Sequence, residues 1–283
     1  MGAELLLDSE VAELCDRCSS AADIDLRRLL TTADDDELRL TQNAQPALCF
    51  VGLGLTVLLR RRGIEPVAAA GHSVGEYTAL VASGGLPWQE ALKLVRERGM
   101  AMAEASSEAQ GMSAVLGLDA AAVEAAIDGV PGTVVVANHN APGQLVISGE
   151  RVSIVAAGER LKAAGAKRVI PLTVAGAFHS PLMAAASERL GAALDRAPLV
   201  DGRPQAFNVD GAIRTAADQV RGALRAQLTS AVHWTDCVRS LLELGVDRFL
   251  ELGSGTTLTA MGKRIAPAAG WASMARPEAL VGP

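Results

Sequence analysis

Apolar residues recur at helical spacing through the first part of the chain. Their spacing of three and four positions from Ser9 to Leu30 predicts a helical opening. The most apolar run, from Ala47 to Leu59, follows Pro46 and ends in arginines. We expect it to form a core helix that is too short to span a bilayer. The short apolar run from Val67 to Ala70 then predicts a buried strand.

Two helices are predicted directly after this strand, and the pattern then changes. Gly75 to Ser83 returns to helical spacing, and a second helix is expected from about Trp88 to Ala105. Between about Gly111 and Val174, short strands enclose helices near Ala120 to Ile127 and Arg151 to Ala164. The predicted strands of this region are the segments MSAVLGL, TVVVAN, QLVISG and KRVIPL.

The order of these elements predicts an α/β fold with two parts. The order βαββαβ is the ferredoxin-like arrangement, so residues 111–174 are expected to form a small inserted subdomain. Past Pro181 the chain alternates helices with strands at Gln205 to Val209 and Arg248 to Leu252. Residues 1–110 and 175–283 are therefore predicted to form an α/β-hydrolase-like large domain with a parallel sheet.

Composition and charge narrow the class of protein. The chain has 283 residues, enough for one large domain that carries an insertion. With a net charge of −6 and a pI of about 5.3, the protein has no overall positive field that would attract nucleic acid or an anionic membrane. The N-terminus lacks the basic and then apolar pattern of a secretory signal, so a cytoplasmic location is expected.

The cysteines are too few and too scattered for a disulfide framework. Cys15 and Cys18 form a CxxC pair, but they lie in an acidic stretch of helical spacing without a second pair. Ordinary helix positions are therefore favoured over a redox or zinc site. No two histidines have metal-ligand spacing either, so we predict no metal.

Gly71 to Gly75 fit the pattern GxSxG, which is typical of a nucleophilic serine on a sharp turn from strand to helix. The glycines permit the tight reversal and lift the hydroxyl of Ser73 clear of the backbone. A helix that begins near Val74 would also aim free amide groups at an oxyanion. Because the turn directly follows an apolar strand, a nucleophile is favoured over a plain turn.

A serine nucleophile needs a base, and His179 is the predicted one. It lies in VAGAFHSPLM, where the chain re-enters the large domain. His72 is adjacent to the serine and would point elsewhere on so sharp a turn, and His139 and His233 have no comparable setting. A buried histidine with satisfied hydrogen bonds is the competing interpretation of His179.

Six segments resemble the malonyl-CoA:acyl carrier protein transacylases and the acyltransferase domains of fatty acid and polyketide synthases. They follow the order of that family and cover nearly the whole chain, so their combination is more specific than any one of them. The segments are GHSVGEY (Gly71 to Tyr77), VRERGMAM (Val95 to Met102), NHNAPGQLVISG (Asn138 to Gly149), VAGAFHSPLM (Val174 to Met183), QLTSAVHW (Gln227 to Trp234) and ELGSGTTLTAM (Glu251 to Met261).

The resemblance implies a role for each matching residue. Ser73 matches the acylated serine, and His179 matches a general base whose imidazole is held by a backbone carbonyl in place of an acid. Arg98 matches the residue that binds the free carboxylate of the malonyl group. Gln227 matches a glutamine that lines the acyl site, and the backbone amide of Val74 matches an oxyanion donor.

Two further matches concern Asn140 and Phe178. Asn140, in the NHN segment, matches a residue of the substrate site. Phe178 belongs to the AFH pattern of members that select malonyl units, and its ring would crowd the α-methyl group of a methylmalonyl unit. The family also opens with a strand and a GQGSQ-type loop that supplies the other oxyanion donor. Met1 and Gly2 match the residues that follow this loop, so slow turnover and reduced stability are expected.

Three functions are compatible with these residues. The favoured one is transfer of a malonyl group from malonyl-CoA, through an ester on Ser73, to the phosphopantetheine thiol of an acyl carrier protein. This function implies a monomeric enzyme of fatty acid or polyketide biosynthesis that uses the coenzyme A thioester as substrate and needs no cofactor. A serine hydrolase or thioesterase of acyl-CoA is the rival enzyme. An incomplete acyltransferase fold that only binds its ligand is the alternative outside enzymology.

Overall fold

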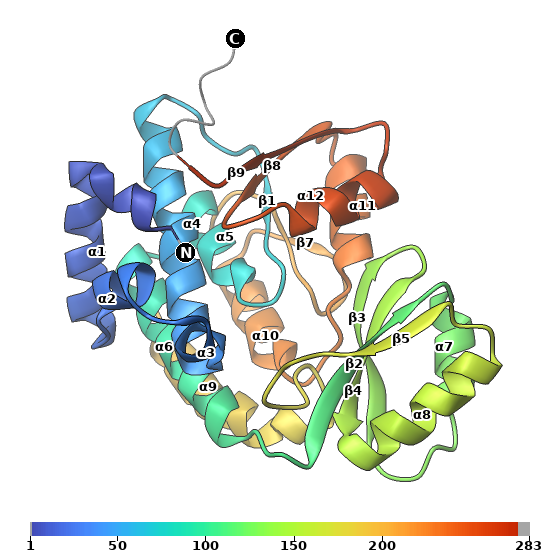
Figure 1. The fold of residues 1–283 in the computed structure, drawn as a ribbon. Coiled ribbons are helices and arrows are strands. Elements are labelled where there is room, and N and C mark those ends of the chain that lie inside the picture. Colours follow the sequence, from blue (N-terminus) through green and yellow to red (C-terminus); the bar gives the residue numbers. More distant parts are fainter. Residues whose placement is uncertain (1, 277–283) are drawn as a thin grey trace.

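The computed structural model describes residues 2–276 and has two parts (Figure 1). Helices and short strands from both ends of the chain form a large part, and the green-to-yellow middle segment forms a small lobe beside it. Met1 and residues 277–283, which the sequence assigned to the large domain, lie outside the described residues.

The helical opening predicted from Ser9 to Leu30 contains a corner. Its elements are η1 (Ala3–Leu7), α1 (Ser9–Ala22) and α2 (Leu26–Thr31), followed by α3 (Asp35–Arg39). Helix α1 stops at Asp23, whose φ of 48° is left-handed. Asp25 then begins α2, because its side chain accepts a hydrogen bond from the backbone N–H of Arg28.

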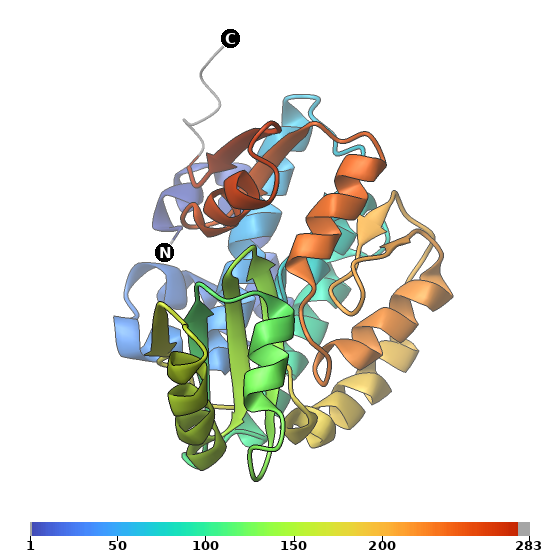
Figure 2. The ribbon, with the colours of Figure 1, turned by 90° about the vertical axis from the view of Figure 1, so that its right-hand side faces the viewer.

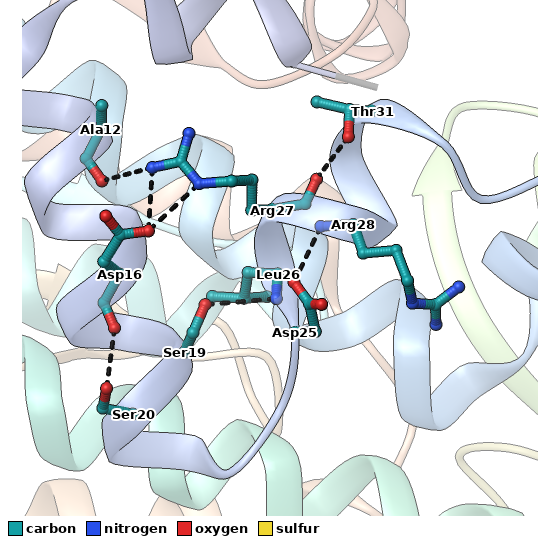
Figure 3. A network of polar contacts seen from close by, with 9 residues as sticks. All are labelled: Ala12, Asp16, Ser19, Ser20, Asp25, Leu26, Arg27, Arg28 and Thr31. Carbon is teal, nitrogen blue, oxygen red and sulfur yellow. Dashed lines mark hydrogen bonds and ion pairs between the residues drawn. The ribbon is translucent and has the colours of Figure 1, made fainter.

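Figure 3 shows how side chains hold this corner. Arg27 of α2 donates to the carboxylate of Asp16 and to the carbonyl oxygen of Ala12, both on α1. The hydroxyl of Ser19 accepts from the backbone N–H of Leu26, at 3.2 Å. The two helices therefore pack against the core at a defined angle.

Helix α4 (Thr41–Arg61) is longer than predicted, because it begins before Pro46 and contains it. Proline has no N–H to give to the carbonyl oxygen of Gln42, and Arg96 donates to that oxygen instead, at 3.0 Å. The prediction concerned only the run from Ala47 to Leu59, whereas the whole helix, with 21 residues, is long and apolar enough to cross a membrane. However, 72% of its most apolar window is buried inside the protein, which makes it a core helix.

The strands of the large part are short. β1 (Ala69–Ala70) pairs in parallel with β6 (Gln205–Ala206), and β7 (Ile213–Arg214) is antiparallel to β6. β8 (Arg248–Leu252) and β9 (Gly270–Met274) form a separate parallel pair. The large part therefore has two small sheets, in which every pairing is parallel except that of β6 with β7.

One predicted strand starts later than the sequence indicated, and another ends earlier. The strand predicted from Val67 is paired only from Ala69, and Val67 itself is exposed. The strand predicted up to Val209 ends at Ala206, because the N–H of Asn208 is hydrogen-bonded to the side chain of Glu76 and not to a neighbouring strand.

Helices surround these strands and form the main core. They are α5 (Gly75–Ser83), α6 (Trp88–Glu104), α9 (Ala184–Arg196), α10 (Ala217–Gln227), α11 (Trp234–Glu243) and α12 (Thr257–Ile265), with a short η2 (Pro181–Met183) before α9. The largest apolar cluster joins α1, α4, α5, α6, α9 and α10. Phe50 and Leu55 of α4 are fully buried in it.

The small lobe has the predicted βαββαβ order. Its elements are β2 (Gln110–Leu116), α7 (Ala120–Ile127), β3 (Val134–Ala141), β4 (Gln144–Glu150), α8 (Arg151–Ala163) and β5 (Arg168–Pro171). The strands form one antiparallel sheet in the order β3-β4-β2-β5, which is ferredoxin-like. Figure 2 views this lobe from outside, with α7 and α8 on the face turned away from the large part. The predicted fold class is confirmed.

Backbone hydrogen bonds join the lobe to the large part. Val232, just before α11, donates to the carbonyl oxygen of Ala137 and accepts from the N–H of His139 on β3, at 2.8 and 2.9 Å. The edge strand β3 of the lobe is therefore hydrogen-bonded to the large part, and its residues reach the turn that carries Ser73.

Candidate active site

Ser73 lies on the turn between β1 and α5, in a strained backbone conformation. Its φ of 53° is in the left-handed region, which residues other than glycine rarely adopt. A Cβ atom at Gly71 would lie 1.9 Å from the carbonyl carbon of Gly75, so only glycine fits at position 71. The first glycine of GxSxG therefore allows the chain to reverse as α5 begins at Gly75.

His179 is hydrogen-bonded to Ser73 on one side and to a backbone carbonyl on the other. Its Nε2 lies 2.7 Å from Ser73 Oγ, and its Nδ1 lies 3.1 Å from the carbonyl oxygen of Gln227. Because a carbonyl only accepts, Nδ1 carries the proton and Nε2 can accept the serine proton. Burial, and then the charge of Arg98, lowers the pKa of His179 to about 3. The imidazole is therefore neutral and suited to act as a base.

Arg98 of α6 is buried beside the same hydroxyl. Only 1% of its surface is exposed, and burial lowers its pKa. Its Nη2 donates to Ser73 Oγ at 2.9 Å, and its other hydrogen bonds go to the side-chain oxygens of Gln45 and Gln227. All these acceptors, within residues 2–276, are neutral. A buried guanidinium without a carboxylate partner at a nucleophile is suited to bind an anionic ligand.

Gln227, the last residue of α10, connects the parts of this site. Its Oε1 accepts from Nε and Nη2 of Arg98, at 3.3 and 3.0 Å. Its Nε2 donates to the backbone carbonyl of Ser73 at 3.0 Å and to the carboxyl group of Glu76. Its own backbone carbonyl holds His179. Gln227 therefore touches the nucleophile residue, the base and the cation at once.

Three residues of the site were missed in the sequence: Gln45, Glu76 and Asn208. Asn208 accepts from the N–H of Ser73 at 2.7 Å and donates to the carbonyl oxygen of Gly71 at 2.8 Å, so it fixes both sides of the turn. Glu76 is fully buried, and burial raises its pKa to about 8. A lone carboxyl in the apolar helix GEYTALVAS was the signal that pointed to Glu76.

The remaining predicted residues surround the turn. Val74 is the N-cap of α5, and no side chain of the described residues caps this helix end. Phe178 is half-buried against a small apolar cluster that includes Met112 of β2. Asn140 of β3 accepts a hydrogen bond from His72, with 2.8 Å between Asn140 Oδ1 and His72 Nε2. Asn140 therefore reaches the residue next to the nucleophile, and its contact is not with Ser73 Oγ.

The other histidines and the cysteines lie apart from this chemistry. His139 and His233 stack on each other, with ring centroids 4.7 Å apart. All four cysteines are buried as free thiols. Among the described residues, no group of three or more His, Cys, Asp or Glu is placed to hold a metal ion.

Comparison with known proteins identifies the family of this chain. A model described as the acyl transferase domain matches residues 1–282. The chain belongs to this acyl transferase domain family. The family resemblance read from the sequence motifs is therefore confirmed, and the protein is an acyltransferase.

Relatives within this family agree in sequence and in structure. A Bacillus subtilis malonyl CoA-acyl carrier protein transacylase is 39% identical over 94% of this chain and 86% of its own. The transacylase of Coxiella burnetii superposes with a TM-score of 0.95 at 33% identity, over 99% of this chain and 90% of the other. A solved structure of a type II PKS acyl-carrier protein in complex with its malonyl-transacylase contains a chain that superposes with a TM-score of 0.94 at 36% identity. The match covers 99% of this chain and 93% of the other.

Proposed function

We propose that this acyltransferase moves a malonyl group from malonyl-CoA to the phosphopantetheine thiol of an acyl carrier protein, through an ester on Ser73. The observation that carries this proposal is the buried Arg98, which donates to Ser73 Oγ at 2.9 Å and whose acceptors among residues 2–276 are all neutral. A malonyl group bound as an ester on Ser73 carries a free carboxylate. That carboxylate is the anion that the guanidinium is placed to bind.

In the first half of the reaction, His179 Nε2 takes the proton of the Ser73 hydroxyl as Oγ attacks the thioester carbonyl. The new C–O bond forms, and the carbonyl oxygen becomes an oxyanion to which the N–H of Val74, at the start of α5, would donate. The C–S bond then breaks, and the coenzyme A sulfur leaves with the proton from His179. The carbonyl oxygen of Gln227 stabilises the imidazolium in between.

The second half reverses these steps with a different thiol. His179 takes the proton of the phosphopantetheine thiol, and the sulfur attacks the malonyl ester. The C–O bond to Ser73 breaks, and Ser73 Oγ recovers the proton. The enzyme returns to its starting state without a metal or other cofactor.

Phe178 would restrict the acyl group. It precedes the base, and its ring packs at the edge of the site beside β2. An α-methyl group would need the space of this ring, which supports selection of malonyl over methylmalonyl units. We also propose that the enzyme acts as a cytoplasmic monomer.

Mass spectrometry after incubation with malonyl-CoA tests this function. We expect one malonyl adduct, which is lost in Ser73→Ala and kept in Ser107→Ala, where an exposed serine changes in the same way. An adduct that persists on Ser73→Ala would remove Ser73 as the nucleophile. Rapid release of free malonate in the absence of carrier protein would instead support a thioesterase, and no adduct at all would support a binding role.

A further inference from the structure

The carboxyl group of Glu76 is hydrogen-bonded to Asn208 and Gln227, two residues that hold the turn of Ser73. It is fully buried at the start of α5, yet it has two hydrogen-bond donors. The backbone N–H of Asn208 donates to Oε1 at 2.5 Å, and Nε2 of Gln227 donates to Oε2. Burial of a carboxyl group costs free energy unless hydrogen bonds or charge pairing compensate for it. Its function should therefore lie in these two contacts.

The contacts of Gln227 are compatible with only one orientation of its side-chain amide. Arg98 only donates, so the side that faces it must be Oε1. The backbone carbonyl of Ser73 and the carboxyl group of Glu76 accept, so the side that faces them must be Nε2. A rotated amide would set donor against donor at Arg98 and acceptor against acceptor at Glu76.

The donors at Glu76 explain why a carboxyl group and not an amide stands there. Both Asn208 N–H and Gln227 Nε2 donate, so both oxygens of residue 76 must accept. A glutamine offers one acceptor oxygen, and its amide group would oppose one of the two donors. The backbone N–H of Asn208 cannot rotate, whereas the side chain of Gln227 can. The conflict would therefore fall on Gln227.

We propose that Glu76 is a positioning residue that orients the amide of Gln227 and, through Gln227 Oε1, holds the guanidinium of Arg98 in place for the carboxylate of the acyl group. This inference rests on the proposed function of the site. Burial raises the pKa of Glu76 to about 8, and the hydrogen bonds from Asn208 and Gln227 oppose that rise. Arg98, Arg214, Tyr77 and Cys237 are the other titratable groups that interact with this carboxyl.

A double-mutant cycle on the full chain tests the proposal, with single-turnover acylation by malonyl-CoA as the readout. Glu76→Gln should slow acylation by about 10- to 100-fold, the usual effect of leaving a buried hydrogen-bond donor without an acceptor. In the Gln227→Ala background the same change should have almost no further effect, because its target is gone. Multiplicative losses, or a Glu76→Gln variant as fast as wild type, would overturn the proposal.

A second readout separates positioning from general damage. Phenylmethanesulfonyl fluoride, an uncharged reagent for reactive serines, does not need Arg98, so Glu76→Gln should react with it at nearly the wild-type rate. Equal losses with both reagents would show that Glu76 supports the fold of the turn instead. Glu188→Gln, which removes an exposed carboxylate on α9, is the matched control and should behave as wild type in both assays.

Thermal melting checks that the variants are folded. If Glu76→Gln is unfolded at the assay temperature, Glu76→Asp replaces it in the cycle, because aspartate keeps both acceptor oxygens at a shorter reach. Its loss should be smaller and should also vanish in the Gln227→Ala background. A wild-type protein that takes no malonyl group would refute the proposed function, whereas normal acylation of wild type and Glu76→Gln alike would refute only the role of Glu76.

Discussion

Ser73 and His179 both have left-handed backbone conformations, with φ of 53° and 56°. Such a conformation costs on the order of 1–3 kcal/mol for a residue with a side chain. At Ser73 the hydrogen bond from its N–H to Asn208 helps to hold the strained turn. The strain places the hydroxyl and the imidazole within 2.7 Å of each other. Stability is thus given up locally for the geometry of the pair.

Arg98→Ala should abolish selectivity for a charged acyl group. Malonylation should fall by about 10² to 10³-fold, because the malonyl carboxylate would be buried without a partner. Acetylation from acetyl-CoA should be kept or should rise, since an acetyl group has no carboxylate to pair. Quenched reactions with malonyl-CoA and with acetyl-CoA measure the ratio of the two acylation rates. Arg239→Ala, on the exposed face of α11, is the control. A similar loss with both substrates would assign Arg98 to the fold.

The acylation rate should be nearly independent of pH between 5 and 7. The pKa of His179 is lowered to about 3 from its ordinary value of 6.5, so the base stays neutral over this range. A histidine that titrated at its ordinary pKa would lose rate by about 30-fold at pH 5. Single-turnover acylation at constant ionic strength distinguishes the two. A clear titration near pH 6.5 would contradict the structural assignment of this imidazole.

Residues with a sequence motif were predictable, and residues defined only by contacts were not. Ser73 belongs to a motif whose chemistry is local, whereas Arg98 was expected only from the resemblance of its segment to a known family. Gln45 and Asn208 are ordinary amides in the sequence, and their importance comes from neighbours 53 and 135 positions away. Only tertiary packing brings these amides to the site, so no pattern in the chain could single them out.

At the scale of elements, α6 packs against α4 through Gly99. A Cβ atom at this position would lie 3.0 Å from Gln42 Cα and 3.1 Å from the carbonyl oxygen of Thr41. Gly99→Ala should push the helices apart and lower the free energy of unfolding by about 1–3 kcal/mol. Because Arg98 and Gln45 lie on the facing turns, malonylation should fall as well. Thermal melting and single-turnover acylation measure the two effects.

Gly222→Ala is the matched control for this prediction. Gly222 lies inside α10, where an added Cβ would meet nothing within 4 Å. Alanine should stabilise that helix by about 0.5–1 kcal/mol, since it restricts the unfolded chain and favours helix. If Gly99→Ala were equally stabilising, α4 and α6 would have room to adjust, and their close approach would not be required for the site.

Helix and strand types were predictable from periodicity, but their ends depended on long-range contacts. The boundaries of α5 and α7 agree with the sequence, because the left-handed Gly84 ends α5 and the side chain of Asp119 caps the start of α7. The start of α4 was misplaced, since Pro46 normally marks a boundary and the sequence does not reveal that Arg96 satisfies the carbonyl left free. Strand β6 is short because the N–H of Asn208, two residues past its end, is hydrogen-bonded to Glu76.

For the whole molecule, two buried groups shape the dependence of stability on pH. His179 has a lowered pKa, so between about pH 3 and 6.5 the unfolded chain binds its proton more tightly, and stability rises with pH. Glu76 has a pKa raised from 4.5 to about 8, so between these values the folded state binds the extra proton, and stability falls as pH rises. From pH 4.5 to 6.5 these two effects oppose each other, and the pKa values of His72 and His139, which burial lowers, add to the rise of stability with pH.

The melting temperature should therefore be highest near pH 6.5 and fall on either side. Between pH 6.5 and 8 the fall should reflect Glu76 alone, with a limiting slope of about 1.4 kcal/mol per pH unit. Glu76→Gln should remove this alkaline decline, steepen the rise between pH 4.5 and 6.5, and leave the dependence below pH 4.5 unchanged. Calorimetry across this range checks the prediction, and an alkaline decline that survives in Glu76→Gln would mean that another group is responsible.

The site joins parts of the chain that leave the ribosome at different times. Ser73 and Gln227 are 154 positions apart. At a synthesis rate of roughly 5–20 residues per second, Gln227 follows Ser73 by roughly 10–30 s. During this interval the small lobe, whose strands pair among themselves, has all its parts, while Glu76 and Arg98 still lack the amide that joins them. A nascent chain is therefore expected to remain inert toward acyl-CoA until α10 has emerged and docked.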